Sequence, residues 1–273
     1  MNRPGLPKLI ATDLDGTLVR SDETVSDYTH AVLSRVRDAG IRIVGATGRG
    51  PRLIELVRAD IPAADFLVLG GGSRVVDISE PEYPVVLRDI RLDGDVLGRL
   101  LADLEREVGT LSVLVEAGDE PDARLWGDLD PTWRWPDVME ARVRAECLAG
   151  PVIKGFARHP DHDADKLLAI ARRLIPESVA SITQAGLGFI EICPPGVDKA
   201  TGLGVVATAL GIDPGDVLVF GDMPNDLPMF AWAGYGRVAV ANAHPQLAAA
   251  ADEICGANDD DGVARYLDRM FGA

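Results

Sequence analysis

The chain has 273 residues, 47% of them hydrophobic and 26% charged, so it can bury a large core as a soluble globular protein. Its 43 acidic and 27 basic side chains give a formal net charge of −16. Nucleic acids and anionic membrane surfaces bind clustered Lys and Arg. The chain has no run of five or six basic residues, which argues against both partners.

Up to about residue 80, short apolar runs alternate with amphipathic segments. The runs KLIATD, IRIVGAT and DFLVLG predict strands, and residues 26–39 and 51–59 between them predict helices. Because the strand runs are apolar on both faces, they favour a parallel sheet covered by helices on each side.

The sequence changes character near Glu80. From about residue 83 to 193, the runs LSVLVE, VIKGFAR, VASITQ and GFIEIC alternate in polarity, which predicts an antiparallel sheet with one exposed face. We expect amphipathic helices at residues 93–108 and 163–174 to cover the other face. This segment is therefore predicted to be a separate α+β module.

After residue 194 the alternation of strands and helices resumes. Residues 199–210 predict a helix, DVLVFGD a strand, NDLPMFAWA a short helix, RVAVANA a strand and DGVARYLDRMF a closing helix. We predict an α/β fold with a doubly wound, mostly parallel Rossmann-like core sheet. Residues 1–82 and 194–273 form this core domain, and residues 83–193 are inserted into it as an α+β domain.

Cysteine usage and the first residues bear on the cellular setting. The three cysteines, Cys147, Cys193 and Cys255, have neither CxxC nor Cys/His spacing, so we expect buried free thiols. The first ten residues, MNRPGLPKLI, lack the apolar core of a signal peptide, and no apolar run approaches the ~18–20 residues of a membrane span. We expect a cytoplasmic protein.

Polar residues gather where the predicted parallel strands end. Ligands of open α/β sheets bind beyond the carboxyl ends of the strands. Asp13 and Asp15 end the first strand, Thr47 and Gly48 follow the second, and Lys199 begins the first element after the insertion. The strand DVLVFGD ends in Asp222 and is followed by Asn225 and Asp226. Four carboxylates, a hydroxyl and a lysine are thus predicted to converge at one edge of the sheet.

Carboxylates this close repel one another by several kcal/mol at an effective dielectric of ~20, so the site calls for a bound cation. A few oxygen ligands with room for water suit Mg²⁺. Mg²⁺ beside a lysine and a hydroxyl suits phosphoryl transfer. A carboxylate nucleophile forms an aspartyl phosphate, and a neighbouring carboxyl group exchanges protons with the leaving alcohol and the attacking water. Paired aspartates fit these two roles.

Four segments, in order along the chain, resemble the motifs of the haloacid dehalogenase-like hydrolases, and within them the Cof-type phosphatases (subfamily IIB). The segments are DLDGT, ATGR, the Lys199 region GVDKATGL, and GDMPNDLPM. The tail segments VAVANAHPQL and ADEICGANDDDGVARYL resemble the end of the same family. The inserted domain lies between the second and third motifs, where this family carries a type-2 cap that selects the substrate.

The resemblance implies a role for each residue. Asp13 is the nucleophile and Asp15 the acid/base, whereas Thr47, Gly48, Lys199 and Asn225 bind the substrate phosphate. The metal ligands are Asp13, the backbone carbonyl of Asp15, and Asp222, with Asn225 and Asp226 completing or bracing the shell. One departure is LGGGSR (residues 69–74), where many members have an Asn-Gly pair. It is either a turn into a hairpin or the sign of a different substrate.

The expected activity is a Mg²⁺-dependent phosphatase for a small phosphorylated metabolite, a sugar phosphate or a phosphorylated cofactor. A phosphomutase or phosphotransferase, and a silent phosphometabolite-binding regulator, are the alternatives. Three tryptophans, Trp126, Trp133 and Trp135, either stack on the substrate or pack in a core. Whether the protein is a monomer or a homodimer is left open. The acidic run NDDDG is expected to cap the closing helix.

Overall fold

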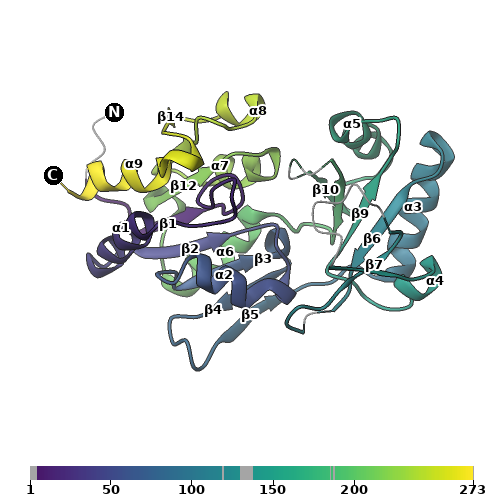
Figure 1. Cartoon of the computed structure of the whole chain (residues 1–273), viewed down its shortest axis with the longest axis horizontal. Helices are drawn as coiled ribbons and strands as arrows, with labels where there is room; N and C mark the ends of the chain where they lie inside the picture. Colours follow the sequence, from purple (N-terminus) through teal and green to yellow (C-terminus); the bar gives the residue numbers. More distant parts are fainter. Residues whose placement is uncertain (1–4, 119, 130–137, 185, 187, 273) are drawn as a thin grey trace. The chain divides into compact units, whose positions relative to one another are not determined.

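The computed structural model describes residues 5–118, 120–129, 138–184, 186 and 188–272. Their contacts divide the chain into two compact units (Figure 1). The core unit consists of Met1–Gly48, Ile54–Arg88 and Asp198–Ala273, and the inserted unit of Arg49–Leu53 and Asp89–Val197. The domain boundaries after residues 82 and 193 stay predictions.

The core unit is built on an eight-stranded sheet. In sheet order its strands are β14 (Glu253–Ile254), β13 (Gly236–Ala239), β12 (Val217–Gly221), β1 (Leu9–Thr12), β2 (Arg42–Ala46), β3 (Phe66–Leu69), β4 (Arg74–Asp77) and β5 (Val85–Asp89). The strands from β14 to β3 are parallel, and β4 runs antiparallel to β3. The prediction of a doubly wound, mostly parallel Rossmann-like sheet is confirmed.

Both faces of this sheet are buried, as its apolar strands predicted. Along β1, Ile10 belongs to one apolar cluster, whereas Leu9 and Ala11 belong to another. The first cluster includes side chains of α1 (Asp27–Asp38), α2 (Ile54–Asp60) and α9 (Gly262–Phe271). The second includes side chains of α6 (Lys199–Leu210), α7 (Leu227–Trp232) and α8 (Pro245–Ala248). Helices therefore hold the sheet from both sides and leave its carboxyl edge to the loops.

The inserted unit has a six-stranded sheet packed on helices. In sheet order its strands are β10 (Ser181–Thr183), β11 (Ile190–Cys193), β9 (Lys154–Arg158), β6 (Ser112–Glu116), β7 (Leu125–Gly127) and β8 (Met139–Ala141). Its helices are α3 (Gly94–Val108), α4 (Arg144–Cys147) and α5 (Ala164–Leu174). Neighbouring strands are antiparallel except β7 and β8, which are parallel.

The face of this sheet that points away from α3 and α5 was expected to be exposed, and it is buried. Leu114 and Phe156 lie on that face and are only 2% and 7% exposed, because they pack with Leu125, Met139 and Phe189. Leu125 and Met139 belong to the short strands β7 and β8, which extend the same sheet beyond β6 and which alternation alone does not reveal.

A five-residue segment that follows the second motif in sequence packs inside the inserted unit. Gly50 lies directly against the buried carboxylate of Glu116, which leaves no room for a side chain at residue 50. Arg52, in the 3-10 helix η1 (Pro51–Leu53), has its Nε 3.5 Å from the Glu116 Oε1. Its Nη1 donates to the Ala123 carbonyl at 3.3 Å, and its own carbonyl accepts from the Asp122 N–H at 3.0 Å.

Two further expectations concern cysteines and tryptophans. All three cysteines are free and buried, as predicted. Trp126 is half-buried, with the Arg142 guanidinium 3.8 Å from its ring centroid. Trp133 and Trp135 lie outside the described residues. Among the described residues, none of the helices is both long and apolar enough to cross a membrane.

The glycine run that departs from the family pattern is a turn between antiparallel strands. Gly70–Gly72 form the 3-10 helix η2 between β3 and β4, with φ angles of 57°, 65° and 114°. A side chain at Gly72 would collide with the backbone of Asp198, just before α6. Glycine is therefore required here for backbone conformation and for close approach.

Candidate active site

The register of the core sheet brings three loops together at one edge. Thr12, the last residue of β1, is paired with Phe220 of β12 and Gly45 of β2. Since these strands are parallel, Asp13 begins its loop beside the loops that carry Asp222 and Thr47. The polar residues that follow these strands therefore lie at the carboxyl edge of the sheet, where ligands of open α/β sheets bind.

Lys199 lies at the centre of the acidic residues. Its Nζ is 2.5 Å from the Asp13 Oδ1 and 2.6 Å from the Asp226 Oδ1, and the residue is 1% exposed. It is the first residue of α6, whose start is fixed by a capping box between Asp198 and Thr201. The cap therefore fixes the start of α6 and, with it, the backbone position of Lys199.

Asp226 holds the loop that follows β12. It is fully buried, and its Oδ2 accepts the N–H groups of Asp222 at 3.0 Å and Met223 at 3.1 Å. Its Oδ1 is paired with Lys199. Both carboxylate oxygens are thus engaged by the protein, so Asp226 links the lysine to the backbone around Asp222.

Asp222 is held by the glycine and threonine of the first motif. The Thr17 hydroxyl donates to the Asp222 Oδ1 at 2.9 Å. Gly16 has φ +79° and lies so close to the Asp222 Oδ2 that a Cβ would overlap it. The sequence predicted Asp222 but missed its contact with Thr17, although the hydroxyl lies within the DLDGT motif.

Asp13 and Asp222, two buried carboxyl groups of this site, have raised pKa values and require nearby positive charge in order to ionise. The pKa of Asp13 is raised well above its ordinary value by burial, against the effect of Lys199, and Asp226 and Asp222 raise it further. Burial and then Asp226 raise the pKa of Asp222 to about 6. Burial acts to lower the pKa of Lys199, but Asp13 and Asp226 outweigh it and raise that pKa, so the lysine is a cation.

One ammonium group faces three buried carboxylates. Ligand oxygens of Asp13, Asp222 and Asp226 lie within 4.8 Å of one another, close enough to share one metal ion. Asn225 is 9% exposed, and its Oδ1 is buried without a hydrogen-bond partner among the described residues. Buried polar atoms are normally paired, so this oxygen and the excess negative charge both fit a divalent cation with bound water.

The other predicted residues follow the same strands. Asp15 is exposed, whereas Thr47 is buried, with its N–H donating to the Val68 carbonyl at 2.8 Å. The Thr47 carbonyl accepts from the Gly71 N–H at 2.9 Å, so the glycine turn holds the second motif; Gly48 is half-buried. Direct contacts join Asp13, Lys199, Asp222 and Asp226. The approach of Asp15, Thr47, Gly48 and Asn225 to a substrate stays a prediction.

Comparison with known proteins decides the family. A sequence model of the haloacid dehalogenase-like hydrolases matches residues 10–116 and 149–267, well over half of the chain. The chain belongs to the haloacid dehalogenase-like hydrolases. Together with the similar phosphatases described next, this match confirms the resemblance to the Cof-type phosphatases and the expectation of a phosphatase enzyme.

Two similar proteins come from Bacillus subtilis (strain 168), and both are named 5-amino-6-(5-phospho-D-ribitylamino)uracil phosphatase. YwtE is 28% identical and YitU 27%, each over 97% of this chain and 98% of the relative. The solved HAD subclass IIB sugar phosphatase BT4131 matches 97% of this chain and 99% of its own with a TM-score of 0.78. At 20% identity, it shows that the fold is shared.

Proposed function

We propose that this phosphatase is Mg²⁺-dependent and hydrolyses a small phosphomonoester through an aspartyl-phosphate intermediate. The observation that carries the proposal is the buried contact of Lys199 with Asp13 and Asp226, beside Asp222. A carboxylate nucleophile, a fixed cation and a set of oxygen ligands are the parts that phosphoryl transfer requires.

The metal would be held by Asp13, Asp222 and the backbone carbonyl of Asp15. Both oxygens of Asp226 are engaged by Lys199 and two backbone N–H groups, which favours bracing over direct coordination for this residue. Bound Mg²⁺ supplies positive charge that offsets the carboxylates and the phosphoryl oxygens.

In the first step an oxygen of Asp13 attacks phosphorus, and the bond from phosphorus to the ester oxygen breaks. Asp15 donates its proton to the departing oxygen, which leaves as an alcohol. In the second step Asp15 takes a proton from water as the water oxygen attacks the phosphorus of the aspartyl phosphate. Inorganic phosphate leaves and the Asp13 carboxylate is restored. Thr47, Gly48, Lys199 and Asn225 bind the phosphoryl oxygens throughout.

The substrate we propose is a phosphorylated sugar or polyol, free or attached to a ring. The names of the relatives support this class: two phosphatases of a phosphoribitylamino-uracil and one sugar phosphatase. We therefore place 5-amino-6-(5-phospho-D-ribitylamino)uracil first among the compounds to be tested. Cytoplasmic localisation stays a prediction.

The test is phosphate release from a panel of sugar phosphates, phosphorylated cofactors and the uracil compound, with Mg²⁺ or with EDTA. Wild type is compared with Asp13→Asn and with the matched control Asp38→Asn, which changes an exposed aspartate at the end of α1. We expect release to need Mg²⁺, to fall by about 10³-fold or more in Asp13→Asn, and to persist in Asp38→Asn.

Three outcomes would contradict the proposal. Phosphate appearing on an added sugar acceptor instead of in solution would identify a phosphotransferase or mutase. No turnover of any compound by folded, Mg²⁺-binding protein would favour a silent binding protein. Unchanged activity in Asp13→Asn would exclude the aspartyl phosphate.

A further inference from the structure

Two asparagines near the end of the chain bind the turn at residues 16–19, which begins within the first motif and leads toward α1. The Asn242 Nδ2 donates to the Gly16 carbonyl at 2.7 Å, and the Asn258 Nδ2 donates to the Val19 carbonyl at 3.0 Å. The two asparagines are also joined, because the Asn258 N–H donates to the Asn242 Oδ1 at 3.0 Å. A backbone N–H only donates, so this bond fixes the orientation of the Asn242 carboxamide and directs its Nδ2 to Gly16.

The two carbonyl groups that these asparagines bind, those of Gly16 and Val19, are at the two ends of the turn that contacts Asp222. Between Gly16 and Val19 lies Thr17, whose hydroxyl binds the Asp222 carboxylate. Gly16 itself lies against the other oxygen of that carboxylate. The His244 N–H donates to the Asp222 backbone carbonyl at 2.7 Å. Residues 242–244 therefore contact both the turn and the aspartate that the turn holds.

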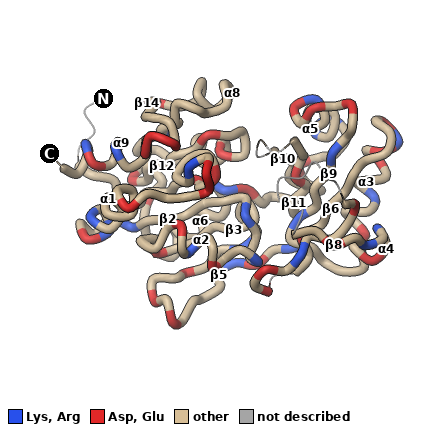
Figure 2. Tube along the Cα trace, viewed as in Figure 1, with Lys and Arg blue, Asp and Glu red and all other residues tan. Residues whose placement is uncertain are grey.

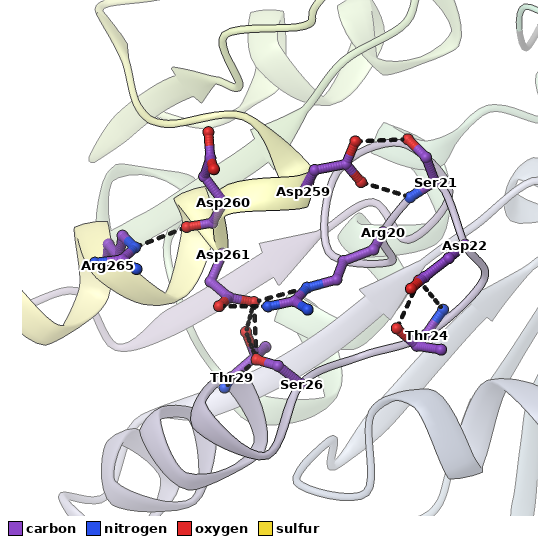
Figure 3. Close-up of polar contacts among 10 residues, drawn as sticks. All are labelled: Arg20, Ser21, Asp22, Thr24, Ser26, Thr29, Asp259, Asp260, Asp261 and Arg265. Atoms are coloured by element: carbon purple, nitrogen blue, oxygen red, sulfur yellow. Dashed lines mark hydrogen bonds and ion pairs between the residues drawn. The ribbon is translucent and has the colours of Figure 1, made fainter.

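Acidic residues extend the same attachment beyond the turn (Figure 3). Asp261 accepts from the Arg20 Nη2 at 2.7 Å and Nε at 3.2 Å, and Asp259 accepts from the Ser21 N–H at 2.8 Å and hydroxyl at 3.0 Å.

The expectation that NDDDG caps α9 is corrected here. Asp261 stands at the N-cap position with φ 56°, and its carboxylate binds Arg20, Ser26 and Thr29 instead of an N–H of α9.

We propose that Asn242 and Asn258 are positioning residues of the phosphatase. They hold residues 16–19 against Asp222, so that its carboxylate keeps the orientation needed to share a cation with Asp13. The inference rests on the proposed function, because it assigns Asp222 to the Mg²⁺ site. Residues that orient a metal ligand through a hydrogen bond typically change metal affinity by 10- to 100-fold when they are removed.

Mg²⁺ binding to the full-length protein tests the inference without any substrate. Calorimetry on wild type and Asn242→Ala should show an approximately tenfold higher Kd for Mg²⁺ in the variant. The matched control is Tyr28→Phe, which removes a side-chain hydrogen bond of 2.9 Å between α1 and Asp268 of α9 and none to the turn. Its Mg²⁺ Kd should stay within twofold of wild type.

A second readout separates positioning from general stability. In Asn242→Ala, the Mg²⁺ concentration for half-maximal phosphatase activity should rise by a similar factor, while saturating Mg²⁺ should restore most of kcat. A loss of stability alone would lower the melting temperature and leave the Mg²⁺ dependence unchanged. Asn258 is buried, so Asn258→Asp is used instead of alanine, because it keeps the size of the side chain while removing the Nδ2 donor; the backbone N–H that binds Asn242 is unchanged. We expect it to weaken Mg²⁺ binding as well.

The inference and the proposed function fail in different ways. An unchanged Mg²⁺ Kd in folded Asn242→Ala and Asn258→Asp would overturn the inference even if wild type is an active phosphatase. Wild type that binds Mg²⁺ but releases no phosphate would overturn the proposed function. The comparison of Kd values between wild type and Asn242→Ala would then still decide the role of Asn242.

Discussion

At the scale of single residues, Lys199 stabilises the acidic site. It is almost fully buried and contacts two carboxylates that are also buried. Removing one partner of a buried ion pair leaves the other charges without compensation, which costs more than the pair contributes. Lys199→Met should therefore lower the free energy of unfolding by about 3–5 kcal/mol in the absence of metal.

Urea denaturation in metal-free buffer measures this change. The matched control is Lys8→Met, which breaks the exposed pair of Lys8 with Asp216, with 66% and 36% of the side chains exposed. Water and salt screen such a pair, so its denaturation midpoint should stay close to wild type. Equal midpoints for Lys199→Met and Lys8→Met would contradict the structural role of Lys199.

Asp222 makes the stability of the metal-free protein depend on pH. Its pKa is raised from an ordinary 3.8 to about 6, mainly by burial. The folded state thus holds this proton more tightly than the unfolded state. The resulting stability is complete below the unfolded pKa and is lost as the pH rises through the folded pKa.

Asp222→Asn removes the buried charge. Without metal, it should be more stable than wild type at pH 8 by about 1–2 kcal/mol, and the difference should shrink toward pH 4. Urea denaturation of both proteins across this pH range is the measurement. Parallel pH profiles, with the same difference at every pH, would show that ionisation of Asp222 does not limit stability.

Residue types in the motifs were sufficient to predict the members of this site, but not their contacts. DLDGT and GDMPND identify Asp13, Asp222 and Asp226, because carboxylates after buried strands need a cation. The bond from Asn242 to Gly16 joins two loops that are 226 residues apart in the chain. No local pattern predicts a contact over such a separation.

At the scale of elements, the close packing of α6 on β3 positions Lys199. Gly202 lies on the side of α6 that faces β3, where a Cβ would overlap the Val68 side chain and come within 3.2 Å of the Gly72 Cα. Gly204, on the same helix, has nothing within 4 Å of an added Cβ. The two glycines therefore allow a matched experiment.

Gly204→Ala should stabilise the protein by about 0.5–1 kcal/mol, since alanine is the better helix former. Gly202→Ala gains the same propensity but forces α6 away from β3, and overpacking of this kind typically costs about 1–3 kcal/mol. Melting temperature and phosphatase activity should therefore fall in Gly202→Ala alone. Stabilisation by both substitutions would contradict a requirement for close packing.

Helices and strands were predictable where burial of one or both faces produces a regular pattern of apolar residues in the sequence. The predicted helix at residues 199–210 matches α6, and the parallel strands followed from runs that are apolar on both faces. The strands β5 and β14 were missed because exposure removes that period: all but Arg88 among the residues of β5, and both residues of β14, are exposed. The predicted helix at 51–59 is η1 followed by α2.

At the scale of the whole molecule, negative charge opposes the approach of a phosphorylated substrate. Acidic residues outnumber basic ones along the chain (Figure 2), and the net charge is −16. Three aspartates, one lysine and a bound Mg²⁺ would nearly cancel at the site. The long-range field is therefore repulsive to an anion, and salt screens it within about 8 Å at physiological ionic strength.

Raising ionic strength from about 10 to 150 mM should thus increase kcat/KM for a phosphomonoester, by about two- to threefold. Free Mg²⁺ must be kept saturating, because salt also weakens Mg²⁺ binding. NaCl and KCl should act alike if screening is the cause. A fall in kcat/KM with salt would instead indicate a local positive field that attracts the substrate.

The two-part architecture was predictable from the change in strand pattern near residue 80, but the membership of residues 49–53 was not. Their place in the inserted unit depends on Gly50 and Arg52 meeting Glu116, far along the chain. In sequence they follow directly on Thr47 and Gly48, which belong to the core unit.

Residues 49–53 affect how the inserted unit can be exchanged between related proteins. The chain passes from one unit to the other after residues 48, 53, 88 and 197, four times where a simple insertion would need two. A chimera that grafts only residues 89–197 onto another core would separate the Glu116 carboxylate from the Gly50 and Arg52 it evolved beside. Its new neighbour would have to leave room for the carboxylate, as Gly50 does here, since an added Cβ at this position would overlap it. Successful transplants should therefore carry residues 49–53 along with the larger fragment.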